Sequence, residues 1–241
     1  MKLAIMQPYL FPYIGYYSLI QNTDYFVFFD TPQYIRKGWI NRNRIVSSKG
    51  TDIYFTVPIE KTFRDAAINT VKISVKENWK EKILGQLTVY KKKAPYFLAV
   101  RDIVCETFAY ETAYISELAV KSILTACEYL GIDIKYEIYS QMDIPSFEVK
   151  EKDEWALYIT KAMGYDTYVN PPGGKNFFNP EKYRREGIQL EFLTQELRKY
   201  NQHSKVFLPG LSILDVMMFC SPKEILQMMD FYILEKGEKS E

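Results

Sequence analysis

The stretch Lys2-Leu3-Ala4-Ile5-Met6-Gln7-Pro8-Tyr9-Leu10-Phe11-Pro12-Tyr13-Ile14-Gly15-Tyr16 decides the fold of this chain. A short apolar strand over residues 2–6 runs into a turn that contains two prolines and then into a helix. The next apolar run, residues 25–29, is aromatic and β-branched, which indicates a strand buried on both faces. The crossover between these strands is expected to be right-handed. We therefore predict an α/β fold with a Rossmann-like N-terminal unit.

Both strands are followed by a polar residue, Gln7 after the first and Asp30 after the second. Ligands of open α/β sheets bind at the carboxyl ends of the strands, so we expect Gln7 and Asp30 to share one crevice. Asp30 is a candidate catalytic carboxylate. It is also a candidate ligand for Mg²⁺, which needs only one or two carboxylates when it accompanies a diphosphate. Tyr9 is a candidate substrate-binding residue, and core packing is the alternative interpretation of the tyrosines around it.

The remaining pattern predicts a mixed, partly parallel sheet flanked by helices, with a helical middle region. We expect one domain over residues 1–241 and a possible helical subdomain over residues 78–131. Strands are predicted at residues 44–47, 52–58, 70–75, 133–139, 167–169 and 188–193, and helices at residues 79–90, 95–108, 114–130 and 152–163.

A polar loop over residues 33–44 combines cations, amides and aromatic rings. Arg and Lys bind phosphate oxygens, Asn and Gln bind sugar hydroxyls, and Trp or Tyr stacks on a base or sugar. A nucleotide sugar would use all three, although a solvated basic loop is the alternative interpretation. The candidate substrate-binding residues in this loop are Gln33, Tyr34, Lys37, Trp39, Asn41, Arg42 and Asn43.

A second loop, residues 170–176, contains two prolines and two glycines. Glycines allow a ligand to approach bare backbone amides closely. The loop matches neither the P-loop pattern nor Gly-x-Gly-x-x-Gly, and a plain connector is the alternative interpretation. Its candidate substrate-binding residues are Asn170, Gly173, Gly174 and Lys175.

Two further residues are candidate catalytic groups. His203 is the only histidine, and histidine is the residue type most often used for general-base catalysis at neutral pH. Asp215 lies three residues after Ser212, where a capping-box acid would stand, so a structural role is the alternative interpretation.

Composition limits the function classes. The 31 basic and 30 acidic residues give no long-range attraction for nucleic acid or anionic membranes. No 18-residue apolar run or signal peptide is present, so we expect a cytoplasmic protein without a membrane span. The three separated cysteines favour buried free thiols, and with a single histidine no zinc ligand set is expected.

Several of these motifs resemble the WbqC-like family in the same order. They are residues 6–16, Asp30 with Gln33-Tyr34, residues 37–43, the Asn170-Pro171 and Gly173-Gly174 loop, and residues 211–215. The resemblance implies a product of bacterial O-antigen or surface-polysaccharide gene clusters. It also implies transfer of an acyl or aminoacyl (glycyl) group to an amino sugar.

A weaker resemblance connects Tyr13-Ile14-Gly15-Tyr16 with the His-x-Gly-His segment of nucleotidyltransferases. Neutral phenols would stabilise phosphate charge poorly, so this resemblance implies a related fold without the adenylylation chemistry.

These observations give three hypotheses. The first is an N-acyl- or aminoacyltransferase acting on a nucleotide-linked amino sugar, with the acyl donor or carrier protein as second partner. The second is a non-catalytic nucleotide-sugar- or glycan-binding protein, and the third is a nucleotidyltransferase-like enzyme that needs Mg²⁺. No motif in the sequence identifies a cofactor or the acyl donor.

Overall fold

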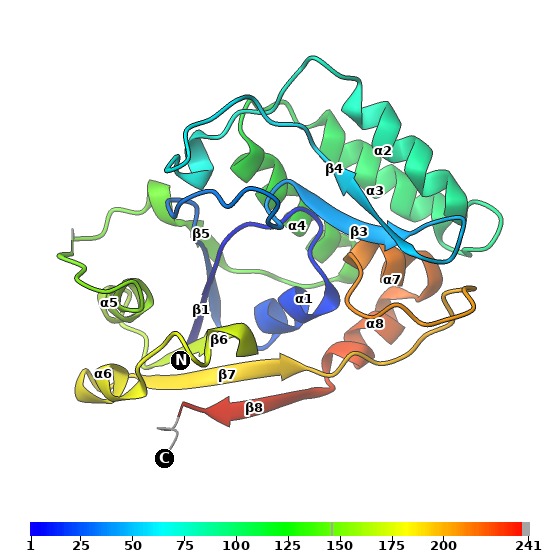
Figure 1. Cartoon of the computed structure of the whole chain (residues 1–241). Coiled ribbons are helices and arrows are strands. Elements are labelled where there is room, and N and C mark those ends of the chain that lie inside the picture. The colour runs from blue at the N-terminus through cyan, green and yellow to red at the C-terminus, as the bar shows by residue number, and fades with distance from the viewer. Residues whose placement is uncertain (146, 238–241) are drawn as a thin grey trace.

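The computed structural model describes residues 1–145 and 147–237. A six-stranded sheet has the order β5-β2-β1-β6-β7-β8, and β3 and β4 form a separate antiparallel hairpin (Figure 1). The strands are β1 (Lys2–Met6), β2 (Tyr25–Phe28), β3 (Arg42–Val46), β4 (Asp52–Thr56), β5 (Tyr136–Ile138), β6 (Thr167–Asn170), β7 (Gln189–Gln195) and β8 (Tyr232–Lys236). The helices are α1 (Ile14–Gln21), α2 (Trp79–Leu87), α3 (Phe97–Ala109), α4 (Ile115–Leu130), α5 (Glu154–Ala162), α6 (Pro180–Arg185), α7 (Ile213–Phe219) and α8 (Pro222–Met229). Short 3₁₀ turns are η1 (Ile68–Thr70), η2 (Thr88–Tyr90), η3 (Tyr139–Gln141) and η4 (Pro172–Gly174).

The sheet confirms the predicted fold class. Strands β5, β2, β1, β6 and β7 pair in parallel, and β8 pairs antiparallel with β7. The chain builds outward from β1 to β2 and β5 and then returns to place β6 on the other side of β1. The strand order therefore reverses between β1 and β6, which is the topological switch point of the sheet.

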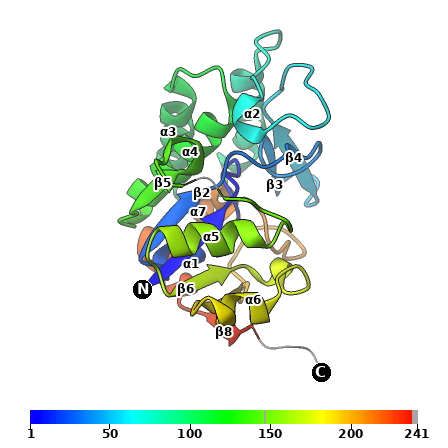
Figure 2. The same cartoon turned by 90° about the vertical axis from the view of Figure 1, so that its left-hand side faces the viewer.

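Helices cover both faces of the sheet (Figures 1 and 2). The alternation of side chains along β1 sends Ala4 to the face of α1, α4, α7 and α8, and Leu3 and Ile5 to the face of α5 and α6. Helices α2, α3 and α4 contribute to the same apolar cluster as α1. The single domain and the helical subdomain over residues 78–131 stay predictions.

The predicted elements differ from the observed ones in a few places. Helix α1 begins only at Ile14, so Tyr9 and Tyr13 lie in the preceding turn rather than on the helix. The predicted strand over residues 70–75 is wrong, because this segment makes only isolated bridges at Lys72 and Ile73. Helix α4 ends at Leu130, where the predicted helix over residues 114–130 ends, and the left-handed Gly131 follows it. Cys105, Cys127 and Cys220 are free thiols, and burial raises the pKa of Cys127 to about 12.

Candidate functional site

A pocket of about 760 Å³ lies at the switch point. Residues at the ends of β1 and β6 and after β2 line it, together with the start of α5 and the 3₁₀ turn η4. Small-molecule sites range from about 300 to 1,000 Å³ and occur preferentially at switch points. In both size and place this pocket, which we call the switch-point pocket, is the best candidate site in the described part of the chain.

The polar side chains that line the pocket differ in how many hydrogen bonds they make within the protein. Within the described residues, the Gln7 amide, the Thr31 hydroxyl and the Lys152 ammonium make no hydrogen bond. Gln33 uses Nε2 to donate to the Arg64 carbonyl at 2.7 Å and keeps its amide oxygen free. The lining side chains with a hydroxyl, amide or ammonium group are Gln7, Tyr9, Thr31, Gln33, Lys152, Tyr168 and Asn170.

Aromatic rings make up much of the remaining wall. The Trp155 ring lies 5.9 Å from the Phe29 ring and 5.9 Å from the Tyr139 ring, in tilted and edge-to-face arrangements. Phe177 is half exposed and lies at the rim. The lining rings are Tyr9, Phe29, Trp155, Tyr168, Phe177 and Phe178. Such rings offer stacking surfaces for a planar or sugar-like ligand.

The turn between β1 and α1, which carries Gln7 and Tyr9, is fixed by residues far away in sequence. Phe11 has a positive φ of 41°, and its carbonyl accepts hydrogen bonds from Asn43 Nδ2 at 2.8 Å and Ser212 Oγ at 2.7 Å. Its amide donates to Ser122 Oγ at 2.9 Å. Asn43, a candidate substrate-binding residue, therefore shapes this turn and lies outside the pocket lining.

Asn41 and Tyr34 are also directed into the protein. The Tyr34 hydroxyl donates to Asn41 Oδ1 at 2.7 Å, and Asn41 Nδ2 donates to the Val57 carbonyl at 2.8 Å. These buried bonds attach the loop of residues 33–41 to the segment after β4. Neither residue lines the pocket.

The basic part of the loop lies on the outer face of the β3–β4 hairpin. The Arg42 guanidinium lies 4.3 Å from the centre of the Tyr54 ring, and Trp39 stacks on Tyr54 with ring centres 6.2 Å apart. Arg42 also donates to the carbonyls of Lys37 and Gly38. Lys37 is exposed, and Lys37, Trp39 and Arg42 all lie outside the pocket lining.

The loop after β6 brings Asn170, Gly173 and Gly174 to the pocket. The Asn170 amide accepts from the Tyr168 hydroxyl and donates to the Pro171 carbonyl, both at 2.8 Å. A Cβ on Gly174 would lie 2.2 Å from Asn170 Nδ2, so only glycine allows this approach. Lys175 is directed away and pairs with Glu235 of β8.

Asp30 lies beside the pocket but is 97% buried by its surroundings, with 3% of its surface exposed. Its two carboxylate oxygens accept hydrogen bonds from the backbone amide of Ser140 at 3.0 Å and from Ser140 Oγ at 2.6 Å. Its chain neighbours Phe29 and Thr31 line the pocket, whereas Asp30 itself does not.

Asp215 lies in a separate buried cluster. It accepts hydrogen bonds from the hydroxyls of Tyr90 and Tyr200, each at 2.5 Å, and from Gln202 Nε2 at 3.0 Å. Burial raises the pKa of the Asp215 carboxyl, and these hydrogen bonds lower it in part. Ser212 caps α7 as predicted, but the Asp215 side chain binds tyrosines instead of completing a capping box.

His203 is exposed and lies near this cluster rather than near the switch-point pocket. Its φ is 49°, its backbone amide donates to Asn201 Oδ1 at 3.0 Å, and its ring lies 5.6 Å from the Phe219 ring. It contributes to a small hollow of about 20 Å³, which has room for little more than a water molecule.

The structure thus brings together six of the predicted site residues: Gln7, Tyr9, Gln33, Asn170, Gly173 and Gly174. The other candidates lie outside the lining. Sequence reasoning missed Thr31, Lys152, Trp155, Phe177 and Phe178. Thr31 directly follows Asp30 at the end of a predicted strand, so its position in the sequence indicates that it could lie at the pocket. Lys152 and Trp155 stand at the start of an amphipathic helix, where a polar and an aromatic residue carry no such signal.

The described residues contain neither a cluster of metal-ligating side chains nor a membrane-spanning helix. No group of three or more His, Cys, Asp and Glu side chains is placed to hold a metal ion there. None of the helices in that part of the chain is long and apolar enough to cross a membrane.

Comparisons with known proteins agree with the motifs. The chain matches the WbqC-like protein family over residues 7–227. It is 26% identical over 219 residues to the uncharacterized protein Rv1507c of Mycobacterium tuberculosis, an alignment that covers 90% of this chain and 92% of that protein. No solved structure matches the chain significantly. Because this match spans most of the 241 residues, the chain belongs to the WbqC-like protein family. The matched range includes every segment that lines the pocket beyond β1.

Proposed function

We propose that the switch-point pocket binds a nucleotide-linked amino sugar and that the protein transfers an acyl or aminoacyl group to the amine of that sugar in the cytoplasm. The observation that carries this proposal is the set of solvent-accessible polar side chains that make no internal hydrogen bond, in a pocket walled by aromatic rings. Amides such as Gln7 suit sugar hydroxyls, rings such as Trp155 suit a base, and the Lys152 ammonium suits a phosphate.

The transfer joins the amine nitrogen of the sugar to the carbonyl carbon of an activated donor. The bond between that carbon and the donor's leaving group breaks, the leaving group takes the electron pair, and a base receives the proton of the amine. Positioning of the two reactants supplies most of the acceleration in this proposal. Asp30 is the proposed base, because it is the carboxylate whose chain neighbours, Phe29 and Thr31, line the pocket, although its own side chain binds Ser140.

A nucleotide-sugar-binding protein that catalyses no reaction is the second candidate. One observation favours it: among the described residues that line the pocket there is no Asp, Glu, His or Cys. Without a carboxylate, histidine or cysteine in contact with the ligand, binding alone accounts for the lining.

The hypothesis of a nucleotidyltransferase-like enzyme has less support. Tyr16, at the position of the second histidine of that motif, is buried and donates its hydroxyl to the Gln7 carbonyl at 2.9 Å. Burial raises the pKa of both Tyr13 and Tyr16, so both phenols stay neutral. A neutral, internally bonded phenol gives a triphosphate little stabilisation.

A thermal-shift panel tests the proposal. It compares UDP-, dTDP- and GDP-linked amino sugars, ATP with and without Mg²⁺, and coenzyme A. A ligand at about 100 times its Kd stabilises the fold by about 2.7 kcal/mol. We expect a nucleotide-linked amino sugar to raise the Tm, and this shift to shrink in Lys152→Ala but not in Lys150→Ala, a matched lysine outside the lining. A shift with ATP and Mg²⁺ alone would favour the nucleotidyltransferase reading.

Mass spectrometry then separates the first two candidates. The sugar that binds is incubated with acyl-coenzyme A, an acylated carrier protein or an aminoacyl adenylate. A mass increase by one acyl or aminoacyl group supports transfer and identifies the donor. Binding with no product from any of these donors favours the binding protein.

A further inference from the structure

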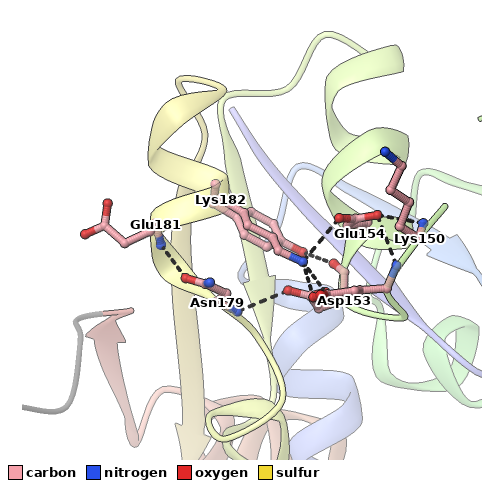
Figure 3. Close-up of polar contacts among 8 residues, drawn as sticks. Lys150, Asp153, Glu154, Asn179, Glu181 and Lys182 are labelled. Carbon is pink, nitrogen blue, oxygen red and sulfur yellow. Dashed lines mark hydrogen bonds and ion pairs between the residues drawn. The ribbon is translucent and has the colours of Figure 1, made fainter. Parts of the chain in front are cut away.

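An ionic cluster connects α6 with the start of α5, the helix that contributes Trp155 and Ala156 to the pocket lining (Figure 3). The Lys182 ammonium of α6 lies 3.0 Å from Asp153 Oδ1, 3.2 Å from Glu154 Oε1 and 2.5 Å from Glu151 Oε2. These three carboxylates belong to the first residues of α5 and the segment before it. One ammonium therefore ties α6 to the start of α5.

The backbone around these carboxylates is fixed as well. Glu154 Oε2 accepts hydrogen bonds from the backbone amides of Lys150 at 2.9 Å and Glu151 at 3.1 Å (Figure 3). The Asp153 carbonyl accepts from the Tyr183 hydroxyl at 2.9 Å. A segment without regular structure of its own thus enters α5 with a defined path.

The same segment presents two residues to the pocket. Lys152 stands between the clamped residues Glu151 and Asp153, and Trp155 follows Glu154. Lys152 is the one lysine or arginine in the described lining, and Trp155 is its one tryptophan. We propose that Lys182 is a positioning residue that holds the start of α5 so that Lys152 and Trp155 face the ligand, an inference that rests on the proposed function for the identity of that ligand.

The charges explain why the cluster depends on Lys182. The side chains of Asp153 and Glu154 are only 6% and 13% exposed. Without the ammonium, neighbouring carboxylates would repel one another and one would be buried without a charge partner, which is strongly unfavourable. Although burial lowers it, hydrogen bonds with Glu151, Asp153 and Glu154 raise the pKa of Lys182 overall, so the ammonium stays charged at neutral pH. Its removal should release the segment toward solvent.

The chain contains a matched control. Lys161 of α5 pairs with Glu186, the residue that follows α6, but both side chains are well exposed and neither lines the pocket. Lys161→Met therefore breaks an ion pair between the same two regions of the molecule without touching the start of α5. Lys182→Arg keeps a cation that can reach the carboxylates.

The test uses full-length protein labelled with 5-fluorotryptophan. Its three tryptophans give three ¹⁹F resonances, and Trp155→Phe assigns the one that matters. We expect Lys182→Met to shift or broaden the Trp155 resonance without added ligand, and to weaken binding of the UDP-, dTDP- or GDP-linked amino sugar at least 5-fold by calorimetry. Lys161→Met should change neither quantity, and Lys182→Arg should restore most of both.

An unchanged Trp155 resonance and unchanged affinity in folded Lys182→Met would overturn the inference. So would equal effects of Lys182→Met and Lys161→Met, because the change would then report general loosening of α5 and α6. If the wild-type protein binds none of the three sugars, the proposed function fails, while the Trp155 resonance still decides whether Lys182 positions this wall.

Discussion

The switch-point pocket and the buried cluster around Asp215 are both rich in polar side chains, but they differ in where the hydrogen bonds go. In the cluster, Tyr90, Tyr200 and Gln202 all donate to the Asp215 carboxylate, and the Gln202 oxygen accepts from the Leu208 amide at 2.8 Å. In the pocket, the Gln7 amide and the Thr31 hydroxyl have no partner among the described residues.

Free energy explains the value of this difference. A buried polar group left without a partner costs about 1–3 kcal/mol, so polar groups in a protein interior are almost always paired. Gln7 and Thr31 avoid this cost because both are partly exposed to solvent. A fully paired cluster serves the architecture, because it has no bonding capacity left for a ligand. Unpaired groups around an open pocket are available to one.

Asp30 has features of both regions, the paired cluster and the pocket. Both of its oxygens bind Ser140, as in a structural cluster, yet it lies between two lining residues. If it is the base, Asp30→Asn should lower turnover at least about 100-fold, a typical lower limit for general-base catalysis, while the Kd for the sugar changes little. Steady-state kinetics and calorimetry measure the two quantities.

The control is Asp52→Asn, which removes an exposed carboxylate paired with Arg44. It should leave turnover unchanged. Full turnover in Asp30→Asn would remove Asp30 from the mechanism and place it with Asp215 among the structural carboxylates.

Tyr200→Phe tests the paired side of the comparison. It removes one hydroxyl from Asp215 Oδ2 and leaves that oxygen with Gln202 alone. We expect the free energy of unfolding in urea to fall by about 1–3 kcal/mol, the cost of an unmade hydrogen bond to a buried charged group. Affinity for the sugar should not change. Tyr110→Phe, at an exposed tyrosine, should alter neither quantity, and a large loss of affinity in Tyr200→Phe would argue against a purely structural cluster.

Strand ends were the most informative part of the sequence. The strand-end pattern predicts that Gln7 and Asp30 share one crevice, but of these two residues only Gln7 lines the pocket. Asn170, which ends β6, lines it as well. The periodicity of strands and helices also predicted the α/β fold. Short elements such as α6 and β8 were missed, because β8 is largely exposed and shows no alternation of buried and exposed residues.

The loop of residues 33–44 shows why the site itself was harder to predict. Asn41 and Asn43 have the side-chain chemistry of sugar-binding amides, but their hydrogen bonds go to the Val57, Leu10 and Phe11 carbonyls. An amide looks the same in sequence whether it binds a distant backbone or a ligand. Only the folded chain shows that distant carbonyls lie within reach.

Gln7→Met tests the unpaired side of the comparison. The substitution keeps the length of the side chain and removes an amide that makes no internal hydrogen bond in the described structure. We expect the free energy of unfolding to change by less than about 0.5 kcal/mol, whereas affinity for the sugar falls about 5- to 10-fold, the value of one hydrogen bond. Gln227→Met on α8, at an exposed glutamine outside the lining, is the control. Equal affinity in Gln7→Met would mean that this amide does not bind the ligand.

Asp215 should also give the free energy of unfolding a small dependence on pH. Burial raises the pKa of its carboxyl in the folded protein above the ordinary value of 3.8. As pH rises above 3.8, the folded state therefore holds more protons than the unfolded state, and the free energy of unfolding falls until the folded carboxyl has ionised. Asp215→Asn lacks this titration, so the difference in stability between wild type and variant should change with pH in that interval and be constant below it.

Urea unfolding of both proteins in steps from pH 3 upward measures this difference. The variant must be subtracted because other carboxyls make the free energy of unfolding rise, rather than fall, with increasing pH. Hydrogen bonds to Glu154 and Glu224 lower the pKa values of these carboxyls, so wild type and variant both lose the stabilisation that these carboxyls contribute as pH falls. Affinity for the sugar should be the same in both proteins at every pH where they are folded, since Asp215 lies outside the pocket lining. A pH-dependent difference in affinity would instead connect the buried cluster with the pocket and remove the division between the two regions.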